Sequence, residues 1–259
     1  MKNFLSGGSE TDIFNDVKET ETTDIYVDSN NSQKLIELVQ QVAWIDTSED
    51  GSGHQPPDFF NAEHKVMIDT MKVDDVVTKK GGKKHPDKQR QSSMLRELKD
   101  AGILDQLPNL DRVFLNPDMS EIPAGEHHTY AAYLSNFTRI VEGHIRSIKN
   151  VYQKNHPGFK TAFLLYDEST LYWQTNDLVE EVKYKQGQGF FGQPHIPWQD
   201  KSFLNVLKVE GLDFVIWVMP WKNPPMQEIL PKIAVLDLNN VDKANLKEYD
   251  PRYMHSDEE

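Results

Sequence analysis

The chain has 259 residues, of which 37% are hydrophobic, and a formal net charge of −13. This apolar content is enough for a packed core and excludes wholesale disorder, and the length allows one large domain or two small ones. The absence of cysteine excludes disulfides, thiolate nucleophiles and cysteine-ligated metal sites, and the acidic charge disfavours nucleic acid unless a local basic patch reverses the field.

The N-terminus has no apolar region of the kind that a secretory signal requires, because Ser6-Gly7-Gly8-Ser9 follows the first five residues directly. No stretch approaches the roughly 18 apolar residues of a membrane span. We therefore expect a soluble, cytoplasmic protein without a membrane segment.

Residues 1–30 carry recurring acids with few large apolar residues between them. We expect an acidic flexible arm, either a solvated tail or a first edge element, with a partner-binding arm as the alternative. Residues 31–46 predict a helix, because Leu35, Ile36 and Val39 share one face.

Residues 58–77 fit two structures. In a helix Phe60, Met67 and Met71 would share a face, whereas in a strand alternate residues would point to opposite sides. The β-branched residues of 73–77 favour a strand, which we place at about 65–73.

Residues 78–91 form a glycine-containing basic loop that we expect to be mobile. Its lysines would contact phosphates if the chain binds nucleic acid: Lys79, Lys80, Lys83 and Lys84. A short helix is predicted at 92–101, ending at Gly102, and a short strand at 112–115.

The C-terminal half alternates helical and apolar strand patterns. A long helix is predicted over 129–154 and a shorter one around Phe203 and Leu207, with strands at 161–166, 171–175, 214–219 and 233–238. The pattern predicts a single α/β domain over 31–250, a layered structure with a mixed, largely buried central sheet and flanking helices. Residues 251–259 are expected to be an acidic tail, mobile from 254 onward.

Several phrases together resemble a group of uncharacterised bacterial proteins of similar size. They are Pro56-Pro57-Asp58-Phe59, residues 65–75, residues 102–106, and His156-Pro157-Gly158 with Asp167-Glu168-Ser169. The resemblance covers roughly residues 35–240. The group has no assigned activity, so the resemblance implies a shared fold and carries over no functional residue.

Pro57-Asp58, followed after ten residues by Asp69-Thr70-Met71-Lys72, is similar to the PD-(D/E)xK nuclease pattern. That pattern uses two acids on adjacent strands to bind Mg²⁺ and a lysine to support the attacking water. Asp58 and Asp69 would be the acids and Lys72 the lysine. The sequence departs from the pattern, because Met71 stands at the lysine position and Lys72, one residue later, would lie on the opposite strand face. Alternatively, Asp58 belongs to a loop and Asp69 is solvated or salt-bridged.

Asp167 and Glu168 follow a buried strand, where they could complete a metal site with Asp58 and Asp69. They are also typical residues of a tight turn. Asp74 and Asp75, with Asp69, either bind a divalent cation or pair with nearby lysines. A zinc site from His128, His144 and an acid is a weaker alternative to a core position for His144.

Phe190 and Phe191 lie in a glycine-rich segment that could contact a partner protein or fold back on the core. Two functions therefore remain open. The first is a metal-dependent nuclease or phosphodiesterase, which the acids and the basic loop at 79–90 favour. The second is a non-catalytic protein-binding module, which the net charge favours.

Overall fold

The structure is a computed structural model that describes residues 9–47, 57–76, 96–103, 128–182, 192–220, 222 and 230–256. Within these ranges, no helix combines the length and the apolar character that crossing a membrane would require.

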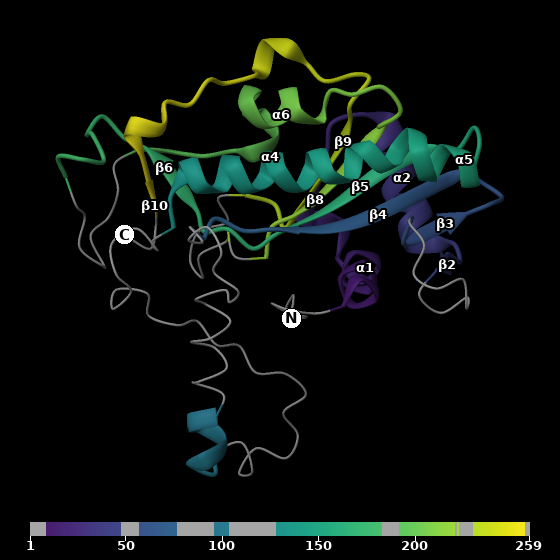
Figure 1. Cartoon of the computed structure of the whole chain (residues 1–259), viewed down its shortest axis with the longest axis horizontal. Coiled ribbons are helices and arrows are strands. Elements are labelled where there is room, and N and C mark those ends of the chain that lie inside the picture. The colour runs from purple at the N-terminus through teal and green to yellow at the C-terminus, as the bar shows by residue number, and fades with distance from the viewer. Residues whose placement is uncertain are drawn as a thin grey trace.

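A mixed seven-stranded sheet forms the centre of the molecule, with strand order β1-β9-β8-β5-β4-β3-β2 (Figure 1). Its strands are β1 (Ile25–Val27), β2 (Ile45–Asp46), β3 (Phe59–Asn61), β4 (Val66–Val73), β5 (Lys160–Asp167), β8 (Phe214–Val218) and β9 (Ile233–Asp237). β4, β5 and β8 run parallel to one another, whereas β3 pairs antiparallel with β4 and β9 pairs antiparallel with β8. The predicted strands at 65–73, 161–166, 214–219 and 233–238 are confirmed.

Helices cover both faces of this sheet. α1 (Glu10–Glu19) and α2 (Asn30–Gln41) pack on one face, and α4 (Tyr130–Ser147) and α6 (Lys201–Leu207) pack on the other. A π-helical turn (Ile148–Tyr152) and the short α5 (Gln153–Asn155) extend α4, so the predicted long helix is confirmed. In the part of the chain that the structure describes, the other helical segments are residues 96–100 and the 3₁₀ turns Thr22–Asp24, Pro197–Gln199, Lys243–Asn245 and Pro251–Tyr253.

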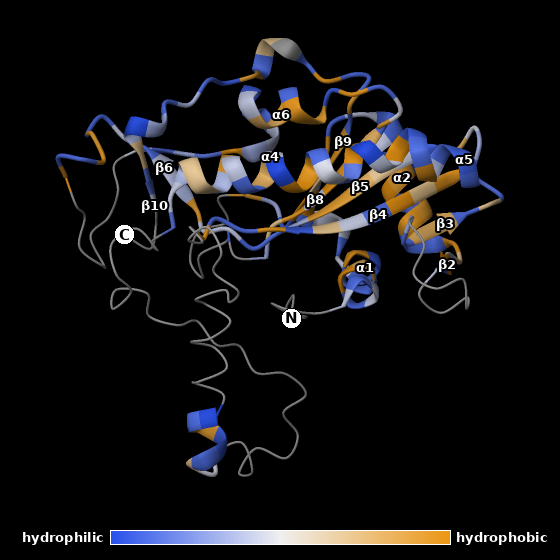
Figure 2. Cartoon of the chain, viewed as in Figure 1, coloured by the Kyte–Doolittle hydropathy of each residue, from blue (hydrophilic) through white to orange (hydrophobic). Residues whose placement is uncertain are grey.

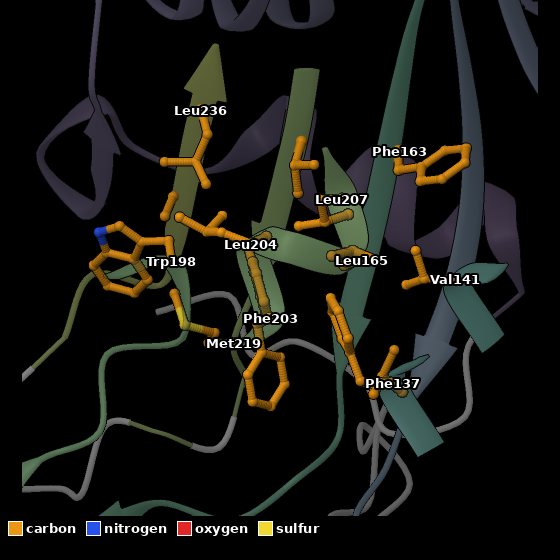
Figure 3. Close-up of a cluster of buried hydrophobic side chains, with 14 of the residues drawn as sticks. Phe137, Val141, Phe163, Leu165, Trp198, Phe203, Leu204, Leu207, Met219 and Leu236 are labelled. Atoms are coloured by element: carbon orange, nitrogen blue, oxygen red, sulfur yellow. The ribbon is translucent and has the colours of Figure 1, made fainter. Parts of the chain in front are cut away.

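Alternate residues of each central strand enter two separate cores. On β5, Phe163 and Leu165 meet α4 and α6, whereas Leu164 and Tyr166 meet the cluster formed with α1 and α2. Figure 3 shows Phe137 of α4 and Phe203 of α6 within the first core. The continuous apolar runs of β5, β8 and β9 follow from this burial on both faces, and Figure 2 shows their hydrophobic colouring. The α/β layered fold is thus confirmed.

The predicted strand at 171–175 does not pair with 161–166, as a tight turn between them would require. β6 (Tyr172–Gln174) leaves the central sheet and pairs antiparallel with β10 (Met254–Ser256) and β7 (Gln193–Pro194) in a separate three-stranded sheet. Gly192 permits the close approach of β7, because a Cβ there would lie 2.4 Å from the carbonyl oxygen of Gln174. The polar residues that suggested a tight turn are instead buried among distant partners.

Two described segments near the chain ends, residues 10–27 and 254–256, are buried or paired where mobility was predicted. Met254 to Ser256 are buried in β10, so the expectation of mobility from residue 254 is wrong for these three residues. The flexible-arm prediction is likewise wrong for residues 10–27. Ile13, Phe14 and Val17 bury one face of α1, and β1 pairs with β9 as a first edge element, the other form that the arm was expected to take.

This burial gives a testable consequence for the N-terminal segment. Ile13 is 1% exposed, so Ile13→Val should lower the free energy of unfolding by about 0.5–1.5 kcal/mol, measured by urea denaturation. Ile45→Val is the matched control, because Ile45 is 43% exposed and the same change there should have almost no effect. Equal effects of the two variants would contradict the docking of α1.

Candidate active site

Asp58 and Asp69 face each other across the β3–β4 pair. The register pairs Phe59 with Ile68, and continuing it by one residue places Asp58 opposite Asp69. The Asp58 carboxylate accepts the Thr70 backbone N–H at 2.7 Å and so continues the pairing of the two strands where β3 begins. The two acids of the nuclease-like pattern are therefore brought together, as their spacing predicts.

The covering helix supplies two further groups. His144 of α4 places Nδ1 2.5 Å from Oδ2 of Asp69, and the Tyr152 hydroxyl donates to the same oxygen at 2.6 Å. Asp69 is 2% exposed, whereas the His144 side chain keeps 34% of its surface exposed. The site thus has a fixed, buried carboxylate beside a histidine that reaches solvent.

The electrostatics of this site reflect two carboxylates held close together. Burial, followed by the charge of Asp69, raises the pKa of Asp58 to about 7, although the Thr70 N–H opposes the shift. Burial disfavours the charged form of His144, but its hydrogen bond to Asp69 and the nearby acid charges raise its pKa overall. Burial and then the Asp69 charge raise the pKa of Tyr152. Asp58 can therefore bind a proton near neutral pH, and the hydroxyl of Tyr152 stays a donor.

Lys72 does not join this site. Alternation along β4 directs Asp69 and Met71 toward α4 and Lys72 toward the opposite face, where its ammonium lies 5.9 Å from the centre of the Tyr166 ring. The departure from the nuclease pattern noted in the sequence is therefore real in three dimensions. Among the described residues His144, rather than a lysine, is the basic group beside the acid pair, and it contacts Asp69.

Asp167 and Glu168 do not converge with Asp58 and Asp69, so the predicted four-acid metal site is wrong. Asp69 is paired with Phe163 in the register of β4 and β5, and Asp167 lies four residues farther along β5. At about 3.3 Å per residue this separates the two acids by roughly 13 Å. Glu168 follows the end of β5, and its backbone N–H donates to the Val73 carbonyl.

Asp167 belongs to a second polar cluster at the carboxyl ends of β4, β5 and β8. Its carboxylate accepts from Tyr133, from Trp217 at 3.0 Å and from the Ser169 hydroxyl at 2.6 Å. Lys222 is 1% exposed and donates to Ser169 Oγ at 2.6 Å and to the Thr170 carbonyl at 2.8 Å, with Asp167 Oδ2 at 3.5 Å. Burial lowers the pKa of Lys222, while Asp167 and Asp75 oppose that shift.

Asp75 is the second buried acid of this cluster, and it contacts only one histidine of the predicted zinc site, His128. Its carboxylate contacts His128 and accepts from the Tyr172 hydroxyl at 2.6 Å and from the Thr170 N–H at 2.9 Å. Because His128 contacts Asp75 while His144 contacts Asp69, the structure does not support a shared zinc site. No three histidine, aspartate or glutamate residues within the described ranges are arranged as a metal-binding group.

Sequence reasoning missed Tyr152, Tyr133 and Lys222. The helical period places both tyrosines on the core face of the long helix, but nothing local indicates which acid each one reaches. For Lys222 the sequence does contain a signal, because it follows the apolar strand β8. The carboxyl ends of neighbouring parallel strands meet at one edge of a sheet, so Lys222 could have been expected near Asp167 at the end of β5.

The predicted phosphate-binding lysines Lys79, Lys80, Lys83 and Lys84 and the predicted partner contacts Phe190 and Phe191 lie outside the described residues. Comparison with known proteins does not add a family: no protein-family model, curated protein or solved structure matches the chain.

Proposed function

We propose that the chain is a divalent-cation-dependent phosphodiesterase that acts on nucleic acid, with Asp58 and Asp69 as its cation-binding acids. The observation that supports this most strongly is the placement of the two carboxylates opposite each other on β3 and β4 beside a partly exposed histidine. Like charges at opposed positions of a strand pair are destabilising, so a cation between them would remove a cost that the fold otherwise bears.

Two protein carboxylates are sufficient for the proposed cation. Mg²⁺ commonly takes one or two carboxylates from a protein and completes its shell with water and substrate phosphate oxygens. The absence of a three-residue metal group in the described part of the chain is therefore compatible with Mg²⁺. When bound, such a cation would lower the pKa of a coordinated water and polarise the phosphate.

The protein groups would have distinct roles. Tyr152 and His144 hold the Asp69 carboxylate in one orientation, and the Thr70 N–H does the same for Asp58. Protonated His144 places a positive charge beside the acids, in the role that the missing lysine has in the nuclease pattern. With no cysteine in the chain, a water rather than a thiolate is the proposed nucleophile.

The test is cleavage of single- and double-stranded DNA and RNA by the purified chain with Mg²⁺ or Mn²⁺, against a sample in EDTA. We expect cation-dependent cleavage that Asp69→Asn lowers on the order of 100-fold or more, because a first ligand is lost while the side-chain shape is kept. Asp242→Asn is the control, because Asp242 is exposed and caps a 3₁₀ turn far along the sequence. Cleavage that survives Asp69→Asn would mean contamination or a different site.

The alternative, a protein-binding module, depends on Phe190 and Phe191 and remains a prediction. Loss of cleavage activity in every cation would leave it as the better explanation. No contact among the described residues supports it directly.

A further inference from the structure

Beside the acid pair lies a set of aromatic rings, a glycine and two lysines, here called the strip. Its residues are Phe60, Lys65, Gly143, Lys154, His156 and Phe159, and none of them contacts the acids in a hydrogen bond described above. Phe60 follows Asp58 by two residues on β3 and packs against the same core as Asp69's neighbours Met67 and Met71. It therefore lies on the α4 side of the sheet, roughly 7 Å along the strand from Asp58. The strip continues from Phe60 onto the segment that follows α5.

Three partly exposed aromatic rings form one end of this strip. The His156 and Phe60 rings have centroids 4.4 Å apart with an interplanar angle of 39°, and the His156 and Phe159 rings are 5.2 Å apart. All three side chains are only partly buried. Burial lowers the pKa of His156, which favours a neutral ring. Neutral aromatic rings of this kind stack on nucleobases.

Gly143 forms the other end of the strip. It lies within α4 directly before His144, and a Cβ built there would meet no described atom within 4 Å. Glycine in a helix interior costs about 1 kcal/mol relative to alanine, and no close packing among the described residues compensates for it. Close approach of a ligand backbone to the helix is a physical reason for glycine at such a position.

Polar and basic groups lie near Gly143 in the sequence. Helical spacing aligns Gly143 with Ser147 on α4. Lys154 is exposed in α5, beyond the π-helical turn and two residues before His156. Lys65, in the turn between β3 and β4, is also exposed, and that turn is joined to the start of β5 by the Lys160 N–H donating to the Lys65 carbonyl at 2.9 Å. Within the described ranges neither Lys65 nor Lys154 forms an ion pair. Two lysines with no ion pair among the described residues, in a chain of net charge −13, complement a phosphate backbone.

We infer that this strip binds single-stranded nucleic acid, with a base stacked on Phe60 and His156, the backbone passing Gly143, and phosphates near Lys65 and Lys154. The inference rests on the proposed function, because it places the phosphodiester next to Asp58 and Asp69. A single strand fits better than a duplex, since an exposed base face is needed for stacking on a ring.

The experiment is fluorescence anisotropy of a labelled 12-nucleotide single strand titrated with the full chain in EDTA, so that binding is measured without cleavage. We expect Phe60→Leu and Gly143→Leu each to weaken binding about 10-fold, the first by removing the stacking ring and the second by filling the path of the backbone. Ala131→Leu adds similar bulk to another exposed position of α4 and should bind as the unaltered chain does. Thermal melting of each variant checks that it is folded, and Gly143→Ala should be slightly more stable than the unaltered chain.

Binding without cleavage in any cation would remove the proposed activity and leave the strip as a nucleic-acid site. Cleavage that is unchanged in Phe60→Leu and Gly143→Leu would overturn the strip while keeping the activity. Equal affinity for a duplex of the same sequence, or no binding of the single strand, would overturn the inference as well.

Discussion

Replacing Lys222 by methionine should lower the free energy of unfolding by about 3–5 kcal/mol, the usual cost of removing one partner from a buried ion pair. Lys222 is 1% exposed and hydrogen-bonded to Ser169 and Thr170, with the buried carboxylates of Asp167 and Asp75 close enough to affect its pKa. Methionine keeps the apolar stem but leaves these acids without their buried cation. Since a domain is stable by only about 5–15 kcal/mol, the loss would be a large fraction of the total.

The measurement is urea denaturation at pH 7, with Lys208→Met as the matched control. Lys208 is exposed at the end of α6, so the same chemical change should alter stability by less than about 0.5 kcal/mol. A loss below about 1 kcal/mol in Lys222→Met would show that the cluster does not depend on its ammonium group, and that Tyr133, Trp217 and Ser169 satisfy Asp167 alone.

This cluster also shows why part of the structure could not be predicted from the sequence. The apolar runs of β8 and β9 and the helical period of α4 are local patterns, and each was assigned correctly. Asp167-Glu168-Ser169-Thr170 reads locally as a turn, but its partners Tyr133 and Lys222 lie 34 residues before Asp167 and 53 residues after Ser169. No local pattern indicates that such partners bury the segment.

In the acid pair, too, the contacts between residues close in sequence were predictable and the contacts between distant residues were not. Asp58 and Asp69 were predictable because a short strand pair brings together residues that are close in sequence, and one turn fixes their register. His144 and Tyr152 contact Asp69 across 75 and 83 residues, so their roles depend on how α4 packs on β4. In α1, three apolar residues with helical spacing were outweighed by the surrounding acids, although they are sufficient to dock the helix.

Replacing Asp58 by asparagine should stabilise the chain at pH 8 and have little effect at pH 4. The pKa of Asp58 is about 7 in the folded chain, against an ordinary value of 3.8. At a pH below both pKa values, Asp58 is protonated in the folded and unfolded chains and does not affect the free energy of unfolding. Between the two pKa values, Asp58 has lost its proton in the unfolded chain but keeps it in the folded chain, so stability falls as pH rises toward 7. Above pH 7 the loss is complete, at most about 4 kcal/mol for a shift of about 3 units.

Asparagine removes this cost because it is neutral at every pH, and its side-chain oxygen can still accept the Thr70 N–H. Urea denaturation of Asp58→Asn and the unaltered chain in EDTA, at intervals from pH 4.5 to pH 8, should therefore give a stability difference that grows with pH. A difference for Asp58→Asn that is the same at pH 4.5 and pH 8 would contradict the raised pKa of Asp58, which burial and then the charge of Asp69 produce. Adding Mg²⁺ should then stabilise the unaltered chain more than Asp58→Asn, because a cation that binds only the folded state offsets the repulsion that the substitution has already removed.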